Sequence, residues 1–113
     1  MDGRLPAHLE VAALLRQTQV EGGFATVVQK GEKQAGTIVV VVCSNGTNAR
    51  AYERMPQLDG TSKWHHSKTE VIDNKHEFQD YLTRRGLQDP DLWIIELDIA
   101  NGERLIGLKP DSP

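Results

Sequence analysis

The chain has 113 residues, of which 38% are hydrophobic and 26% charged, and a formal net charge of -3. These values are typical of one globular domain and exclude a collagen-like or largely disordered chain. A general nucleic-acid binder normally carries a basic excess, so nucleic-acid binding is disfavoured here unless a local patch carries it. We therefore expect a single domain over residues 1–113, in which 109–113 form a frayed tail.

Cysteine content and hydropathy indicate the compartment. Cys43 is the only cysteine, which excludes a disulfide within the chain and a cysteine-rich zinc site. The longest apolar run, 38–43, is far shorter than the roughly 20 residues of a membrane-spanning helix. The N-terminal residues also lack the apolar core of a signal peptide. The sequence therefore predicts a cytoplasmic protein with no membrane partner and no cofactor.

Two segments have the composition of helices. Residues 7–19 follow Pro6, contain good helix formers and no helix breaker, and precede a glycine pair at 22–23 that suits a helix end. The second helix begins after Asn74, where a glutamate three residues later fits a capping box, and Gly86 is expected to end it. We expect each helix to bury an apolar face.

Segments with the residue pattern of strands lie at 24–30, 37–43, 49–55, 63–71 and 92–99. The polar loop 31–36 predicts a hairpin between the first two strands, and Asn45-Gly46 predicts a tight turn between the second and third. The second strand is apolar on both faces, so it should be central and covered on both sides, by helices or by a partner chain. The more polar fourth strand is expected at an edge, and 103–108 are expected to form a last short element.

This element order, α-β-β-β-β-α-β, predicts an α+β fold with a mainly antiparallel sheet of about five strands and two helices. Two helices do not comfortably cover both faces of such a sheet. If both pack on one face, one row of the second strand stays open, either Ile38, Val40 and Val42 or Val39 and Val41. An open apolar row would bind a second subunit, which predicts a homodimer through an apolar sheet face.

No catalytic or metal-binding pattern is specific enough to assign a site. Adjacent His65 and His66 point to opposite faces of a strand, so one metal site cannot easily use both. Cys43 ends the most apolar strand, where a thiol packs as a small hydrophobe rather than acting as a nucleophile. Glu96 and Asp98 fit a solvent-facing strand surface better than a catalytic carboxylate pair. We therefore assign no catalytic residues and no metal ligands.

A basic and aromatic face is the sharpest candidate for ligand binding. Arg50, Tyr52 and Arg54 alternate along the third strand and so share one side of it. A hairpin with the fourth strand would place Trp64 opposite Arg54, His66 opposite Tyr52 and Lys68 opposite Arg50. Cations and rings together can bind phosphates or bases, and the candidate site is Arg50, Tyr52, Arg54, Trp64 and Lys68. The alternative, which we favour, is a half-exposed sheet face whose arginine stems cover Trp64 and Tyr52.

Seven short segments are shared with a known family: Arg4-Leu5-Pro6-Ala7, Ala12-Ala13-Leu14-Leu15-Arg16, Gly22-Gly23-Phe24-Ala25-Thr26-Val27, Lys30-Gly31, Ala35-Gly36, Tyr52-Glu53-Arg54 and Asp89-Pro90-Asp91-Leu92-Trp93. On these segments the chain resembles a family of small alphaproteobacterial proteins known only as a domain of unknown function. The resemblance covers residues 4–106, and Asp-Pro-Asp-Leu-Trp is its most specific part. It implies a bacterial cytosolic protein and brings no activity, ligand or catalytic residue.

Together these observations favour a non-enzymatic protein-interaction module that forms homodimers. The first alternative is a nucleotide or RNA-binding protein that uses the basic and aromatic face. The second is a metal-dependent hydrolase built on His65 or His66 with Asp98 or Glu96.

Overall fold

A computed structural model describes residues 5–108, so the tail predicted at 109–113 lies outside the described residues. The elements are α1 (Ala7–Val20), β1 (Phe24–Gln29), β2 (Ile38–Ser44), β3 (Thr47–Pro56), β4 (Ser62–Thr69), α2 (Lys75–Gln88), β5 (Trp93–Asp98) and the 3₁₀ helix η1 (Gly102–Ile106). Two helices and a five-stranded sheet therefore follow the predicted order, which confirms the α+β class. None of the described helices is long and apolar enough to cross a membrane.

The strand order in the sheet is β1-β5-β2-β3-β4. Three neighbouring pairs are antiparallel, and β2 with β5 is parallel, so the sheet is mixed. The predicted hairpin between β1 and β2 is wrong, because β5 lies between them. Their connecting loop contacts the start of β5 instead, where the amide of Glu32 donates to the carbonyl oxygen of Asp91 at 2.9 Å and the indole of Trp93 donates to the carbonyl oxygen of Glu32 at 2.8 Å.

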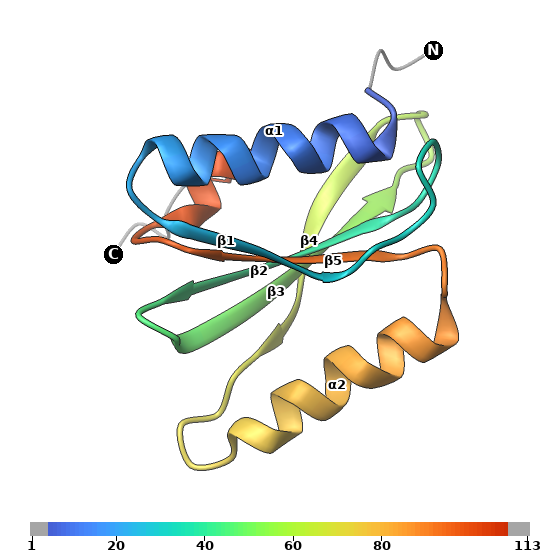
Figure 1. Ribbon diagram of the computed structural model, residues 1–113. Coiled ribbons are helices and arrows are strands. Elements are labelled where there is room, and N and C mark those ends of the chain that lie inside the picture. The colour runs from blue at the N-terminus through green and yellow to red at the C-terminus, as the bar shows by residue number, and fades with distance from the viewer. Residues whose placement is uncertain (1–4, 109–113) are drawn as a thin grey trace.

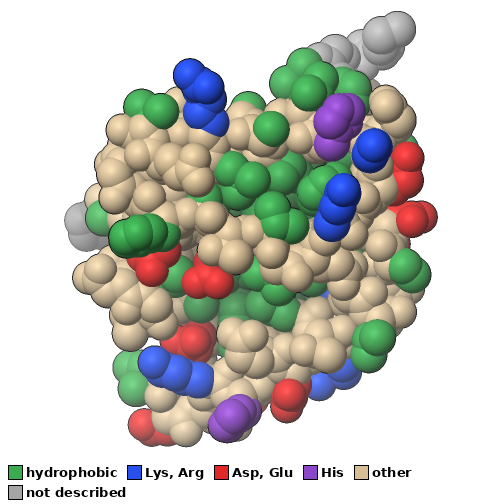
Figure 2. Space-filling model, in the orientation of Figure 1, with side chains coloured by type: hydrophobic (Ala, Val, Ile, Leu, Met, Phe, Trp, Pro, Cys, Tyr) green, Lys and Arg blue, Asp and Glu red, His purple; other side chains and the backbone are tan. Residues whose placement is uncertain are grey.

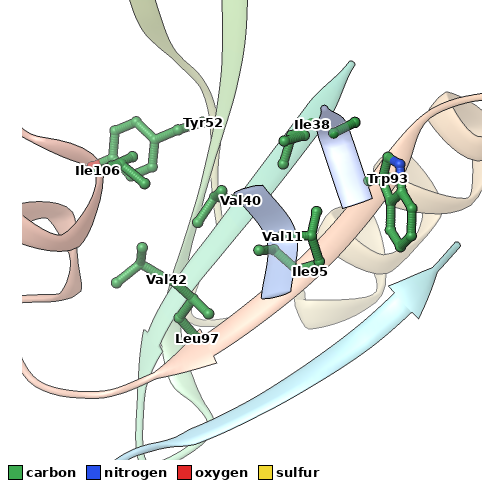
Figure 3. Close-up of a cluster of buried hydrophobic side chains, with 10 residues drawn as sticks. Val11, Ile38, Val40, Val42, Tyr52, Trp93, Ile95, Leu97 and Ile106 are labelled. Carbon is green, nitrogen blue, oxygen red and sulfur yellow. The ribbon is translucent and has the colours of Figure 1, made fainter. Parts of the chain in front are cut away.

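The two helices cover opposite faces of the sheet (Figure 1). On one face, Ile38, Val40 and Val42 belong to a buried cluster with Val11 of α1 (Figure 3). On the other face, Val39, Val41 and Cys43 are buried with Phe78 and Leu82 of α2. The prediction that β2 is central and covered on both sides is confirmed, and the expectation that one of its rows stays open is wrong. The apolar row through which a homodimer was expected is therefore covered within the chain itself.

Local sequence rules explain several of the element ends. Asn45 and Gly46 have positive φ values of 53° and 73°, as a type I′ turn between β2 and β3 requires. The side chain of Asn74 accepts a hydrogen bond from the amide of Glu77 at 3.2 Å, so the predicted cap of α2 is confirmed. Gly22, with φ of 91°, follows the end of α1 as expected.

Gly86 does not end α2, contrary to expectation. The helix continues to Gln88, and Gly86 is buried within it. A methyl group at this position would collide with the side-chain oxygen of Gln29. The side-chain amide nitrogen of Gln29, Nε2, donates to the carbonyl oxygen of Leu92 at 2.9 Å. The glycine therefore makes room for a side chain that ties β1 to the start of β5.

Candidate functional site

β3 places Arg50, Tyr52 and Arg54 on the face of the sheet that carries α1. The β2 partners of Arg50 and Tyr52, Val42 and Val40, are members of the cluster beneath α1, and directly paired residues point to the same side. Arg54 follows Tyr52 by two residues along β3 and so lies on the same face. On β4, Tyr52 pairs with His66 and Arg54 pairs with Trp64, as the sequence predicts. The edge position of β4 is also confirmed.

Lys68 does not join this group. A bulge between Ala51 and Tyr52 shifts the register, so that Arg50 pairs with Thr69 and Lys68 pairs with Ala51. Lys68 therefore points to the opposite face, where its Nζ lies 2.8 Å from a carboxylate oxygen of Glu77 on α2. The predicted pairing of Arg50 with Lys68 is wrong because a bulge adds one residue that strand alternation does not reveal.

A pocket of about 610 Å³ lies between β3, β4 and the segment around η1. Its lining residues are Ser44, Asn48, Arg50, Tyr52, Trp64, His66, Ala100, Asn101, Glu103 and Leu108. Three of the five predicted site residues are among them: Arg50, Tyr52 and Trp64. The sequence did not predict that residues of the segment 100–108 line this pocket, because no local pattern relates η1 to a strand about 50 residues earlier.

Glu103 is the centre of a hydrogen-bonded network in this pocket. Its carboxylate accepts from Nε of Arg50 at 2.5 Å, from Nη2 of the same residue at 3.1 Å and from the hydroxyl of Tyr52 at 2.7 Å. Burial raises the pKa of Glu103, but the hydrogen bonds from Arg50 and Tyr52 outweigh it and lower the pKa to about 2. Burial and the hydrogen bond to Glu103 raise the pKa of Tyr52 to about 12. At neutral pH the pocket therefore holds a neutral phenol and a compensated ion pair.

Arg54 also contacts other side chains of the described chain. Its guanidinium carbon lies 5.1 Å from the centroid of the Trp64 ring, and Nη1 donates to Oε1 of Glu10 on α1 at 2.6 Å. Arg54 therefore lies over Trp64, one of the two rings that the favoured alternative expects arginines to cover. Both arginines of the face therefore already have a carboxylate partner, which weakens the case for a phosphate-binding surface.

The structure does not bring the residues of the hydrolase alternative together. His66 contacts Tyr52, with ring centroids 5.1 Å apart, and its Nε2 lies 2.7 Å from the hydroxyl of Thr69. Glu96 and Asp98 lie on the α2 face of β5, which is separated from β4 by two strands. Over residues 5–108 there is no group of three or more side chains suited to hold a metal ion.

Hydrogen bonds within the fold occupy the side chains of Cys43, Glu96 and Asp98. The Cys43 thiol donates to Oε1 of Glu96 at 3.1 Å, and burial, followed by this hydrogen bond, raises the pKa of the thiol to about 12. The interpretation of Cys43 as a buried small hydrophobe is confirmed. The carboxylate of Asp98 accepts from the amides of Asn45 and Gly46 at 2.7 and 3.0 Å, which fixes the β2–β3 turn.

The model of a protein family described as "Protein of unknown function (DUF1491)" matches residues 5–107. The chain belongs to the DUF1491 family. A crystal structure of a DUF1491 protein from Caulobacter crescentus CB15 is 28% identical, with a TM-score of 0.77 over 92% of this chain and 96% of that one. An NMR structure of a DUF1491 protein from the same organism is 28% identical, with a TM-score of 0.78 over 96% and 97% of the two chains.

Protein Atu0922 from A. tumefaciens has a solution structure that is also similar. It is 27% identical, with a TM-score of 0.77 over 96% of this chain and 99% of that one. No curated protein matches the chain. The DUF1491 fold therefore extends over nearly the whole chain.

The two sheet edges of this DUF1491 protein differ in chemistry. The β4 edge carries two lysines and two histidines, and charged side chains are a common protection of a free edge. The β1 edge, with the sequence FATVVQ, has no charged residue and no proline. Phe24 is 77% exposed and Val28 is 50% exposed. In Figure 2, apolar side chains are visible both between α1 and the sheet and between the sheet and α2.

A groove of about 250 Å³ runs between β1 and α2 of the DUF1491 domain. Val28 and Gln29 line it from β1, Ile94 from β5, and Leu82 and Leu87 from α2. Leu87 is 79% exposed, although it belongs to the same helix as the buried Leu82. We call the uncharged edge, together with the groove beside it, the β1 edge surface (Phe24, Val28, Gln29, Leu82, Leu87 and Ile94).

The Glu103 network predicts acid sensitivity. A carboxylate whose pKa is lowered on folding stabilises the fold above its unfolded pKa, and this stabilisation is lost as the pH falls through the folded pKa. The contribution of Glu103 is therefore expected to be present above a pH of about 4.5 and to disappear towards about 2. Urea denaturation across this range should show a weaker pH dependence for Glu103→Gln than for the unmodified chain. Asp80→Asn, which changes an exposed carboxylate on α2, is the control and should keep the original dependence.

Proposed function

We propose that the protein is a non-enzymatic interaction module that pairs its free β1 edge with an extended strand of a partner. The contrast between the two edges supports this function. A free strand offers a row of backbone donors and acceptors, and only the β4 edge carries the charges that discourage pairing. The proposed setting is the bacterial cytosol, since a single cysteine leaves no disulfide to form within the chain.

Strand addition uses the features that the β1 edge surface combines. Main-chain hydrogen bonds along the edge supply affinity, and pockets for alternate side chains supply specificity. The groove lined by Val28, Leu82 and Leu87 is placed to receive apolar side chains from an added strand. Exposed apolar area of this kind on one side of a domain is typical of an interaction site.

The partner that we propose is a second copy of the chain. Two antiparallel β1 strands related by a twofold axis present the same residues to each other, so that one uncharged edge complements itself. Such pairing would join two five-stranded sheets into one continuous sheet. The proposed homodimer thus uses a sheet edge, in place of the sheet face that the sequence had suggested.

Substitution of Val28 by lysine tests this function. Analytical ultracentrifugation over a concentration range up to about 1 mM, the weak end of specific association, should show a reversible dimer for the unmodified chain. Val28→Lys should weaken dimerisation at least about tenfold, because a lysine on a paired edge is costly to desolvate.

His65→Lys is the matched control, since it adds a lysine to an exposed position on the other edge strand and should leave association unchanged. A chain that stays monomeric over the whole range would contradict self-pairing through β1. Equal weakening by both substitutions would also contradict it.

A further inference from the structure

The pocket between β3, β4 and η1 is separate from the β1 edge surface. It lies on the face of the sheet that carries α1, whereas the groove of the β1 edge surface lies on the face that carries α2. Its volume of about 610 Å³ is within the range of small-molecule sites in proteins. The pocket is therefore a separate candidate for ligand binding.

Aromatic side chains form one wall of this pocket. Tyr52 and His66 lie with ring centroids 5.1 Å apart and planes inclined by 31°, and Trp64 lies on the same face of β4 as His66. His66 is exposed and Trp64 is half-buried, so both rings can meet a ligand. Such a wall suits a flat ring, because offset stacking of aromatic groups is favourable.

The charge of the pocket selects against an anionic ligand. Among residues 5–108, Arg50 is the only arginine or lysine that lines the pocket, and its bidentate contact with Glu103 compensates its charge. Nη1 of Arg50 also donates to the carbonyl oxygen of Asn48 at 2.5 Å. Arg54, which follows on the same face of β3, donates to the carboxylate of Glu10. A phosphate group would therefore have to displace an existing carboxylate partner.

Polar groups around the aromatic wall provide hydrogen bonds in both directions. Ser44, Asn48 and Asn101 line the same pocket, and a hydroxyl or side-chain amide can both donate and accept hydrogen bonds. An uncharged heteroaromatic ring carries donors and acceptors along its edge and a π surface on each face. We propose that this pocket binds an uncharged heteroaromatic ring of the nucleobase type, stacked against His66 and Trp64.

Adenosine is the probe for this proposal. Titration of the isotope-labelled chain with adenosine to about 5 mM, which covers weak binding, should give saturable amide shifts in pocket residues. His66→Ala should weaken binding at least about fivefold, the lower end of the loss of one base–aromatic stack. Fluorescence quenching of Trp64, absent in Trp64→Phe, gives a second readout, because Trp93 is buried.

His65→Ala is the matched control, since the adjacent residue points to the opposite face and should leave binding unchanged. Adenosine monophosphate should bind no more tightly than adenosine, and inorganic phosphate should not compete with it. Absence of saturable shifts would overturn the proposal. So would monophosphate binding more than about tenfold tighter than adenosine, which would indicate a phosphate site instead. Equal weakening by His65→Ala and His66→Ala would likewise overturn it.

Discussion

Replacing Phe78 by alanine is expected to lower the free energy of unfolding by about 3–5 kcal/mol, as for other buried phenylalanines. Phe78 is 1% exposed and packs with Leu82 in the cluster that holds α2 against the sheet. Removal of its ring leaves a cavity under the helix, because neighbouring β-strands cannot collapse into the space. Chemical denaturation followed by circular dichroism would measure the loss.

Leu87→Ala is the control for this substitution. It removes an apolar side chain of comparable length from the same helix, but Leu87 is 79% exposed. Its effect should stay within about 0.5 kcal/mol. A loss below about 1 kcal/mol for Phe78→Ala would contradict the position of α2 on the sheet.

Gly31→Ala is expected to cost about 3 kcal/mol, near the upper end of overpacking substitutions. A methyl group at Gly31 would collide with the backbone carbonyl oxygen of Asp91 and lie 2.7 Å from the carbonyl carbon of Leu92. Both neighbours are backbone atoms of the two residues that precede β5, so neither can rotate away. The same denaturation measurement applies.

This substitution distinguishes the observed sheet from the hairpin that the sequence suggested. In a solvent-exposed hairpin loop, an alanine in place of Gly31 would have little effect. Lys30→Ala changes an exposed neighbour and should be almost neutral. A neutral Gly31→Ala would show that the loop does not pack on the segment 91–93.

Elements with local causes were predictable from the sequence. Helix composition, the Asn74 cap and the Asn45-Gly46 turn depend on residues close in the chain, and all three are confirmed. The all-apolar pattern of β2 correctly indicated a central strand with both faces covered. Strand order was not predictable in the same way, because backbone pairing of distant strands leaves little trace in side-chain patterns. For this reason the position of β5 between β1 and β2 was not predicted.

In the candidate site, too, local features were predicted and long-range contacts were not. Alternation along β3 correctly placed Arg50, Tyr52 and Arg54 on one face, and the register with Trp64 and His66 was also right. Lys68 was misplaced because a bulge is a backbone feature without a residue signature here. Glu103, which compensates Arg50, is far away in the sequence, so its role became visible only in three dimensions.

The position of β5 has a consequence for how the chain folds. Of the five described strands β5 is the last to be synthesised, yet it is the neighbour of both β1 and β2. Until it arrives, β1 has no partner among the described strands and the apolar residues of β2 lack one of their two neighbours. Such long-range pairing raises contact order, and domains of high contact order fold in milliseconds to seconds rather than microseconds. Until β5 docks, β1 and β2 are therefore expected to stay exposed to other chains.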